Sequence, residues 1–179
     1  MPRDHLPVND LTITALNPGV SLDTFNCDDS DLNDFLKKDA PVYEHNGIAR
    51  TYVCLYQNSP IGFFSICADA IRLSMEERKG EFGKGKLHPD YPAMKIARLG
   101  VSADFQGRGV GTSLVKIAIG KAISLSREIG CRFVTVDSYP KQVDFYLKCG
   151  FIRNLEDKSG ENVSLRLDLL DYLSLNQAR

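Results

Sequence analysis

The chain has 179 residues, of which 43% are hydrophobic and 25% are charged, and its net charge is −1. This length and composition are typical of a globular protein with a real core, so we expect a single domain over residues 1–179, with flexible tails at 1–9 and 172–179. The near-zero net charge gives no overall electrostatic attraction to nucleic acid or to a membrane surface, although it leaves room for a local basic patch.

Cysteines and histidines give no indication of a metal centre or a disulfide framework. The five cysteines are scattered, odd in number and without a C-x-x-C pair, and the three histidines are isolated. We therefore expect no metal, and free thiols in a reducing, cytoplasmic environment. The N-terminus lacks the basic and apolar segments of a signal peptide, and no apolar run approaches the roughly 18 residues of a membrane span, so no membrane association is expected.

The N-terminal half of the chain predicts three strands and two short helices. Runs of alternating or β-branched residues mark the strands. Apolar residues at i, i+3 and i+4 predict a helix over 31–38, with Asp28, Asp29 or Ser30 as its N-cap. Aspartates near its start and lysines near its end match the helix dipole. The expected elements are strands over 11–16, 48–56 and 61–68 and helices over 31–38 and 40–46.

The second half of the chain predicts a strand–helix–strand unit. The segment 69–91 is polar and contains glycines, so we expect a long loop with one helical turn, a length that is typical of functional loops. The apolar stripe that follows predicts a long helix, and a helical crossover would make the strands on either side of it parallel. The expected elements are strand 93–102, helix 109–128, strand 132–137, helix 141–148 and strands 151–153 and 161–167.

Three glycines cluster in the turn 106–112, between a strand and the long helix. A glycine-rich turn at a helix N-terminus presents backbone amides to an anion, which suggests a phosphate-bearing ligand. The turn lacks the Lys-Ser/Thr ending of a nucleotide-binding P-loop, and its glycines do not have the G-x-G-x-x-G spacing of dinucleotide folds. Taken alone, the turn is compatible with a phosphate site or with a plain tight turn.

Two motifs together resemble signatures of the GNAT superfamily of N-acetyltransferases. Residues 106–111, Gln-Gly-Arg-Gly-Val-Gly, resemble its Q/R-x-x-G-x-G/A signature, and residues 145–151, Phe-Tyr-Leu-Lys-Cys-Gly-Phe, match its F-Y-x-x-x-G-F signature. The resemblance implies an α/β (α+β) fold with a mixed, mostly antiparallel sheet flanked by helices, in which two parallel strands splay apart at the cofactor cleft. It also implies an enzyme that uses acetyl-CoA as donor and no metal.

The resemblance further implies roles for individual residues. Leu99, Gly100 and Val101 resemble the family's cofactor strand, whose backbone would bind the pantetheine arm and stabilise the oxyanion. The backbone amides that would hold the pyrophosphate belong to Gln106, Gly107, Arg108, Gly109, Val110, Gly111 and Thr112. Glycines suit this loop because a Cβ would push the phosphates away from the amides. Tyr146 is the expected catalytic residue, a general acid that protonates the departing thiolate.

A general base is not indicated by any motif. Some members of the superfamily carry a glutamate on the cofactor strand, but residues 95–99 contain no carboxylate. Asp137 at the end of the next strand, Asp69, and deprotonation through ordered water stay open as alternatives. Cys149 has no histidine near it in the sequence, so we expect direct transfer without a covalent enzyme intermediate.

The acceptor of the acetyl group is the least defined part of this interpretation. The leading hypothesis is transfer to a primary amine of a small molecule or a protein. A narrower resemblance, carried by residues 25–27, 31–36 and 50–53, is to a branch that includes acetyltransferase toxins of bacterial toxin–antitoxin pairs. Such toxins acetylate the amino group of aminoacyl-tRNA, pair with small ribbon-helix-helix antitoxins and often form homodimers.

Charge weighs against the toxin alternative, because a protein that binds tRNA should be distinctly basic. Basic residues do gather in the predicted long loop, at Arg78, Lys79, Lys84 and Lys86, although such residues are more often a solvated surface. A third alternative is a non-catalytic sensor that binds acyl-CoA on the same fold.

Overall fold

The computed structural model describes residues 4–82, 88–155 and 160–177. Two compact units make up the chain. The first combines Met1–Cys67 with Ile96–Ala118, and the second combines Ala68–Lys95 with Ile119–Arg179. The expectation of a single domain over the whole chain stays a prediction.

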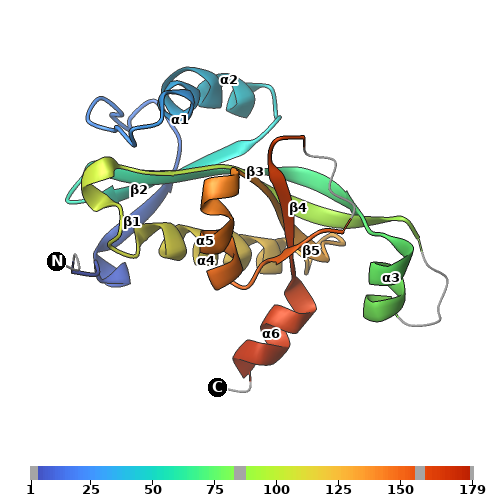
Figure 1. Ribbon diagram of the computed structural model, residues 1–179. Coiled ribbons are helices and arrows are strands. Elements are labelled where there is room, and N and C mark those ends of the chain that lie inside the picture. Colours follow the sequence, from blue (N-terminus) through green and yellow to red (C-terminus); the bar gives the residue numbers. More distant parts are fainter. Residues whose placement is uncertain (1–3, 83–87, 156–159, 178–179) are drawn as a thin grey trace. The chain divides into compact units, whose positions relative to one another are not determined.

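Seven strands form one mixed sheet in the order β1-β2-β3-β4-β5-β7-β6 (Figure 1). The pairs β1–β2, β2–β3, β5–β7 and β6–β7 are antiparallel, whereas β4 and β5 are parallel. The strands are β1 Leu11–Ala15, β2 Arg50–Tyr56, β3 Ser59–Arg72, β4 Asp90–Val101, β5 Phe133–Ser138, β6 Ile152–Arg153 and β7 Val163–Asp168. This mixed, mostly antiparallel sheet with helices around it confirms the predicted fold class, including the parallel pair on either side of the long helix.

The first unit contains a helical segment over residues 30–45, where the sequence predicts two separate short helices. It consists of α1 Ser30–Asp34, the π-helical turn Phe35–Asp39 and α2 Ala40–His45. Of the three candidate caps, Asp29 is the one used, because its side chain accepts a hydrogen bond from the Leu32 amide at 3.1 Å. The core of this unit includes the buried residues Phe25, Phe35, Leu36, Val53 and Phe63.

Helices cover both faces of β3 within the first unit. Phe63 packs towards α1 and the π-helical turn, where its ring centroid lies 5.5 Å from that of Phe25 and 6.1 Å from that of Phe35. The preceding residue faces the other way, because successive residues of a strand alternate between faces. A Cβ built on Gly62 would lie only 3.0 Å from Leu114 Cδ1, so the helix α4 Val110–Leu125 packs closely on that face.

The segment 69–91 is not the long loop that the sequence predicts. β3 continues to Arg72, α3 occupies Met75–Phe82, and β4 begins at Asp90. Arg72 and Asp90 pair through two hydrogen bonds of 3.0 Å, which join the two strands beyond the expected boundaries. The prediction failed because polar residues at exposed strand ends look like loop residues in the sequence. Two of the basic residues assigned to this loop, Lys84 and Lys86, lie outside the described residues.

A buried ion-pair network anchors α3 within the second unit. Arg166 on β7 is 4% exposed and donates to Glu77 Oε1 at 2.6 Å and to Asn154 Oδ1 at 2.9 Å. It also pairs with Glu81, one helical turn further on. Glu77 additionally accepts a hydrogen bond from the Leu155 amide at 2.9 Å. The contacts that Glu77 and Glu81 make with Arg166 and Leu155 join residues that are 78 to 89 positions apart, so no local pattern in the sequence predicts them.

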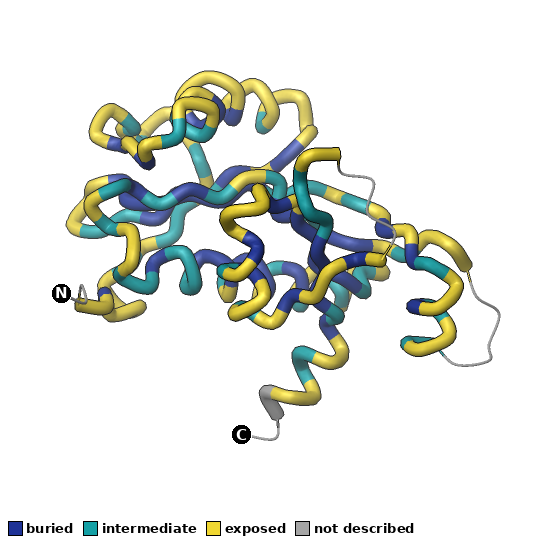
Figure 2. The backbone as a smooth tube through the Cα atoms, viewed as in Figure 1, coloured by how far each residue is buried: buried dark blue, intermediate teal, exposed yellow. Residues whose placement is uncertain are grey.

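Two helices complete the second unit. α5 Val143–Lys148 follows a 3₁₀ turn at Pro140–Gln142 and agrees with the predicted helix, whereas α6 Leu169–Gln177 is a helix that the sequence does not predict. β5 is buried over most of its length (Figure 2). Further 3₁₀ turns lie at Val8–Asp10 and Ala103–Phe105. In the described part of the chain, no helix is both long and apolar enough to cross a membrane.

Candidate functional site

The end of β4 leads into the glycine loop of the first unit. Leu99 and Val101 are partly buried, and Gly100 between them is buried. A side chain cannot be placed at Gly100 without movement, because a Cβ there would lie 2.7 Å from Phe63 Cε1. The glycine at this position is therefore explained by the packing of the Phe63 ring.

Gln106, at the beginning of the loop, forms hydrogen bonds with the backbone of neighbouring segments. Its side-chain amide donates to the Val101 carbonyl at 3.1 Å and to the Cys27 carbonyl at 3.2 Å. Its main-chain amide donates to the Ala103 carbonyl at 3.3 Å. Because that amide already has an acceptor, the amides left to an anion start at Gly107. The role of Gln106 as a cofactor-binding residue stays a prediction.

The rest of the loop presents amides that the protein itself does not use. In the described residues, the main-chain amides of 107–112 have no hydrogen-bond acceptor. Gly107 and Gly109 have φ angles of +74° and +80°, a left-handed conformation that glycine adopts at little cost. The loop ends at the first turn of α4, where the helix dipole also favours negative charge. The loop can therefore bind a phosphate or pyrophosphate group.

A segment near the N-terminus packs directly on this loop. Residues 4–6, called the N-terminal strap below, are held by a hydrogen bond from the Leu6 amide to the Arg108 carbonyl, at 3.1 Å. The Arg108 Nε donates in return to the Asp4 carbonyl at 3.2 Å, and the guanidinium lies over the Phe105 ring, 5.3 Å from its centroid. Sequence reasoning missed this contact and placed the strap in a tail, because nothing local marks a partner about 100 positions away.

The strap changes the explanation for one of the loop glycines. A Cβ built on Gly109 would lie 2.6 Å from His5 Cε1 and closer still to His5 Nδ1. The space that a side chain would need is thus taken by an imidazole ring rather than left free for phosphate. A Cβ on Gly107, by contrast, would meet nothing within 4 Å in the described structure.

Tyr146 lies on α5 in the second unit and is 7% exposed. Its ring centroid is 4.9 Å from that of Phe145 and 5.6 Å from that of Phe151, both at steep angles, so the ring is held from two sides. Burial raises the pKa of the Tyr146 phenol well above its usual value. The neutral phenol therefore keeps its proton available for donation.

The two aspartates considered as a general base are both engaged within the second unit. Asp137 at the end of β5 forms an ion pair with Lys95 of β4. Asp69 of β3 accepts a hydrogen bond of 2.5 Å from the Thr135 hydroxyl. Each carboxylate thus already has one donor, on its Oδ2 atom, and no contact of either aspartate identifies it as the general base.

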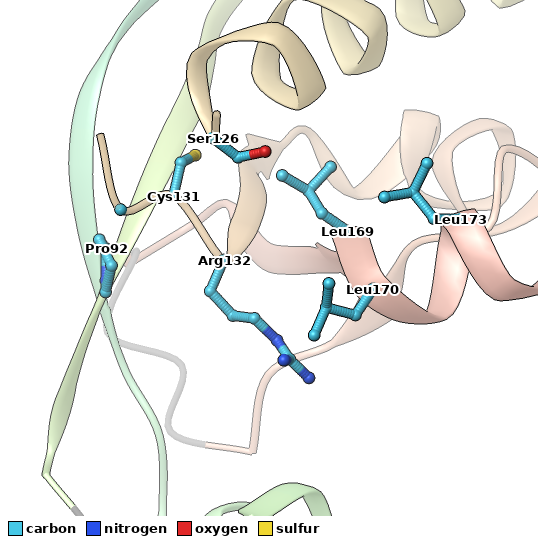
Figure 3. A pocket seen from close by; sticks show the side chains of 8 residues that line it. Pro92, Ser126, Cys131, Arg132, Leu169, Leu170 and Leu173 are labelled. Atoms are coloured by element: carbon cyan, nitrogen blue, oxygen red, sulfur yellow. The ribbon is translucent and has the colours of Figure 1, made fainter. Parts of the chain in front are cut away.

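A metal-binding cluster or a separate pocket would be an alternative site. In the described residues, no group of three or more histidines, cysteines, aspartates or glutamates could hold a metal ion. A pocket of about 290 Å³ lies in the second unit, with three leucines of α6 on one side and Arg132 on the other (Figure 3). Arg132 is itself held by Asp168 at 2.6 Å. None of the predicted site residues lines this pocket.

The mixed sheet with the parallel pair β4–β5 and a glycine loop that opens the helix between these strands agree with the acetyltransferase fold that the sequence motifs imply. A family model described as an acetyltransferase (GNAT) domain matches residues 47–153, which is more than half of the chain. The chain therefore belongs to the GNAT acetyltransferase family, and the prediction of an acetyltransferase enzyme is confirmed.

Similar proteins narrow the comparison further. A tRNA-acetylating toxin of Mycobacterium tuberculosis (strain ATCC 25618 / H37Rv) is 26% identical over 113 residues, which are 63% of this chain and 66% of the relative, just under two thirds of its length. A tyrosine-to-phenylalanine variant of the toxin AtaT, bound to the C-terminus of the antitoxin AtaR and acetyl-CoA, is 24% identical with a TM-score of 0.75, covering 93% of this chain and 98% of AtaT.

AtaT has also been solved in complex with acetyl-methionyl-tRNAfMet. That structure is 23% identical, has a TM-score of 0.80 and covers 93% of this chain and 99% of its own. At such identities the solved structures establish a shared fold. The predicted resemblance to GNAT acetyltransferases, and to their toxin branch, is thereby confirmed as a similarity.

Proposed function

We propose that this chain transfers an acetyl group from acetyl-CoA to the amino group of an aminoacyl-tRNA, and that a small antitoxin neutralises it. The similarity to a tRNA-acetylating toxin carries this proposal, and the AtaT complexes with acetyl-CoA, antitoxin and acetylated tRNA agree with it. These comparisons support the toxin alternative better than a small-molecule or protein acceptor. A non-catalytic sensor is disfavoured because the chain belongs to an enzyme family.

The donor site of the proposal rests on the glycine loop. The unpaired amides of residues 107–112 and the start of α4 suit the pyrophosphate of acetyl-CoA, which supplies the reactive acetyl thioester. Backbone groups of Leu99 and Val101 would hold the pantetheine arm and polarise the thioester carbonyl. The fit of this loop to an anion supports acetyl-CoA as the donor independently of the acceptor.

Tyr146 would serve the same reaction as general acid. The acceptor nitrogen forms a bond to the acetyl carbon, the carbon–sulfur bond breaks, and the sulfur leaves with the electron pair. Tyr146 would donate its proton to that sulfur, and the proton released by the amine would restore the phenol, so charge and atoms balance. The buried position of the Tyr146 ring and the raised pKa of its phenol support this role.

The acceptor can be tested directly with purified protein. We expect radiolabelled acetyl-CoA to label aminoacyl-tRNA but not the same tRNA after its amino acid has been removed. Mild alkali, which cleaves the aminoacyl ester, should release the label as an N-acetylated amino acid. Labelling of deacylated tRNA, or efficient labelling only of free amines or of a protein lysine, would contradict the proposal and restore the small-molecule or protein acceptor.

A second test addresses the toxin role in cells. Expression of the wild-type chain should arrest growth, whereas a chain with Tyr146→Phe should not. Co-expression of the product of a small neighbouring gene should restore growth if that product is the antitoxin. Equal growth with the wild-type and the variant chain would overturn the toxin assignment even if acetylation were observed in vitro.

A further inference from the structure

The N-terminal strap and the glycine loop contact each other through a defined set of groups. The Leu6 amide of the strap donates a hydrogen bond to the Arg108 carbonyl. The Arg108 side chain donates a hydrogen bond to the Asp4 carbonyl of the strap. The strap uses none of the amides of residues 107–112, which stay without an acceptor in the described structure. The strap and an anion would therefore occupy different groups of the same loop.

His5 is the member of the strap that contacts Gly109 of the loop. Its flanking residue Leu6 is buried and anchors the strap, whereas His5 is exposed and its imidazole lies against the α-carbon of Gly109. Gly109 has a left-handed φ, and the next residue, Val110, begins α4. The ring thus stands beside the amides at which the pyrophosphate is proposed to bind.

The strap also fixes the side chain of Arg108. The hydrogen bond to the Asp4 carbonyl and the contact with the Phe105 ring hold the guanidinium in one place. The Arg108 guanidinium is a positive charge in the glycine loop, and guanidinium groups form charge-assisted hydrogen bonds with phosphate. The strap therefore fixes the position of the Arg108 guanidinium.

We propose that His5 is a phosphate-binding residue of the acetyl-CoA site, held against the glycine loop by the N-terminal strap. This inference rests on one part of the proposed function, the binding of acetyl-CoA. It does not depend on which amine is acetylated. The imidazole donates a hydrogen bond to a pyrophosphate oxygen that also accepts from the loop amides. Strap and donor substrate then bind together, and each stabilises the other on the loop.

The test is calorimetric titration of the full chain with three ligands. His5→Ala should weaken acetyl-CoA binding by about tenfold, the loss expected for one hydrogen bond to a charged group. The loss should be equal for 3′-dephospho-acetyl-CoA, which keeps the pyrophosphate, and absent for S-acetylpantetheine, which has none. His45→Ala, at an exposed histidine of α2, is the matched control and should leave all three affinities unchanged.

Several outcomes would overturn the inference. An unchanged affinity of His5→Ala for acetyl-CoA removes His5 from the site, and a tighter affinity makes the strap a competitor of the substrate. An equal loss with S-acetylpantetheine assigns His5 a purely structural role. His5→Gln, which keeps a donor, should recover part of the affinity, and thermal unfolding verifies that both variants fold.

The same titration separates this inference from the proposed function. If the wild-type chain does not bind acetyl-CoA, the donor part of the proposed function and this inference fail together. If the wild-type chain binds and His5→Ala binds equally well, only this inference fails. If binding behaves as expected but aminoacyl-tRNA is not acetylated, the acceptor is wrong and His5 keeps its role.

Discussion

At the scale of single residues, the contact between His5 and Gly109 gives a reason for a glycine in the loop that the sequence motif does not show. Gly107 and Gly109 have similar left-handed backbones, but only Gly109 has a neighbour where its Cβ would be. That neighbour is His5, which the motif itself cannot reveal. The two left-handed glycines of this loop are thus required for different reasons.

These two glycines allow a matched comparison. Gly107→Ala and Gly109→Ala should each lower the free energy of unfolding by about 1–2 kcal/mol, the cost of a left-handed non-glycine residue, measured by urea denaturation. Only Gly109→Ala should also displace the His5 ring, seen as a change of its imidazole NMR signals. A shift of those signals by Gly107→Ala, or none by Gly109→Ala, would contradict the observed contact.

Tyr146 offers the sharpest test of the chemistry. Tyr146→Phe keeps the ring between Phe145 and Phe151 but removes the acid, so kcat should fall by about 10²–10⁴-fold with an unchanged Kd for acetyl-CoA. Single-turnover kinetics and calorimetry measure the two quantities. Tyr43→Phe, at a partly exposed tyrosine of α2, is the control and should keep full activity. Full turnover by Tyr146→Phe would exclude the residue from the mechanism.

Asp137 is expected not to be the general base, because its carboxylate is paired with Lys95. Asp137→Asn should therefore reduce kcat/KM by far less than the roughly 100-fold that the loss of a general base costs. Its pH–rate profile should keep the shape of the wild-type profile. A large loss together with the disappearance of a titration step would reinstate Asp137 as the base.

At the scale of elements, α3 is held by a buried charge network and by a capping box at its start, in which the Ser74 amide donates to Glu77 and the Glu77 amide donates to the Ser74 hydroxyl. Burial by itself raises the pKa of Glu77, but the amides of Leu155 and Ser74 and the guanidinium of Arg166 outweigh it, so the pKa lies below its ordinary value of 4.5. Arg166, in turn, is satisfied by Glu77, Glu81 and Asn154. The helix thus persists because both signs of charge are paired in a buried place.

This network predicts a specific pH dependence of stability. A carboxylate with a lowered pKa stabilises the fold above its ordinary value, and the contribution is lost as pH falls below about 4.5 and through the folded pKa. Glu77→Gln should cost about 2–3 kcal/mol at neutral pH and flatten the loss of stability below that pH, both measured by urea denaturation.

The neighbouring Glu76 provides the control for this experiment. It is exposed on the same helix, so Glu76→Gln should leave both the stability and its acid dependence within experimental error of the wild type. An acid dependence of Glu77→Gln equal to that of the wild type would show that Glu77 does not carry the effect. The acid dependence of stability would then be assigned to Glu81, the other carboxylate that pairs with Arg166.

At the scale of the whole molecule, the donor substrate should stabilise the fold. A ligand that binds only the folded chain raises the free energy of unfolding by about 2.7 kcal/mol when its free concentration is 100 times Kd. We expect this increase with acetyl-CoA, measured by denaturant titration, and the same increase for Tyr146→Phe. No increase for the wild-type chain would contradict the assignment of the glycine loop as a donor site.

The sequence alone was enough for the features that depend on neighbouring residues. Alternation and helical spacing predicted most strands, α4 and α5, and the two motifs at 106–111 and 145–151 predicted the GNAT fold and its acetyltransferase activity, both confirmed. For the acceptor, the comparisons favour the toxin alternative over the small-molecule or protein acceptor that was ranked first, because overall charge was weighed against tRNA although charge is a poor guide when binding is local.

Only the tertiary structure decided which distant side chains meet. It placed His5 against Gly109, Arg166 against Glu77, and the Tyr146 ring between two phenylalanines. It also extended β3 and β4 and added α3 and α6. The physical reason is the range of the interactions: backbone periodicity and turn chemistry are set by residues a few positions apart, whereas side-chain contacts depend on how the whole chain packs.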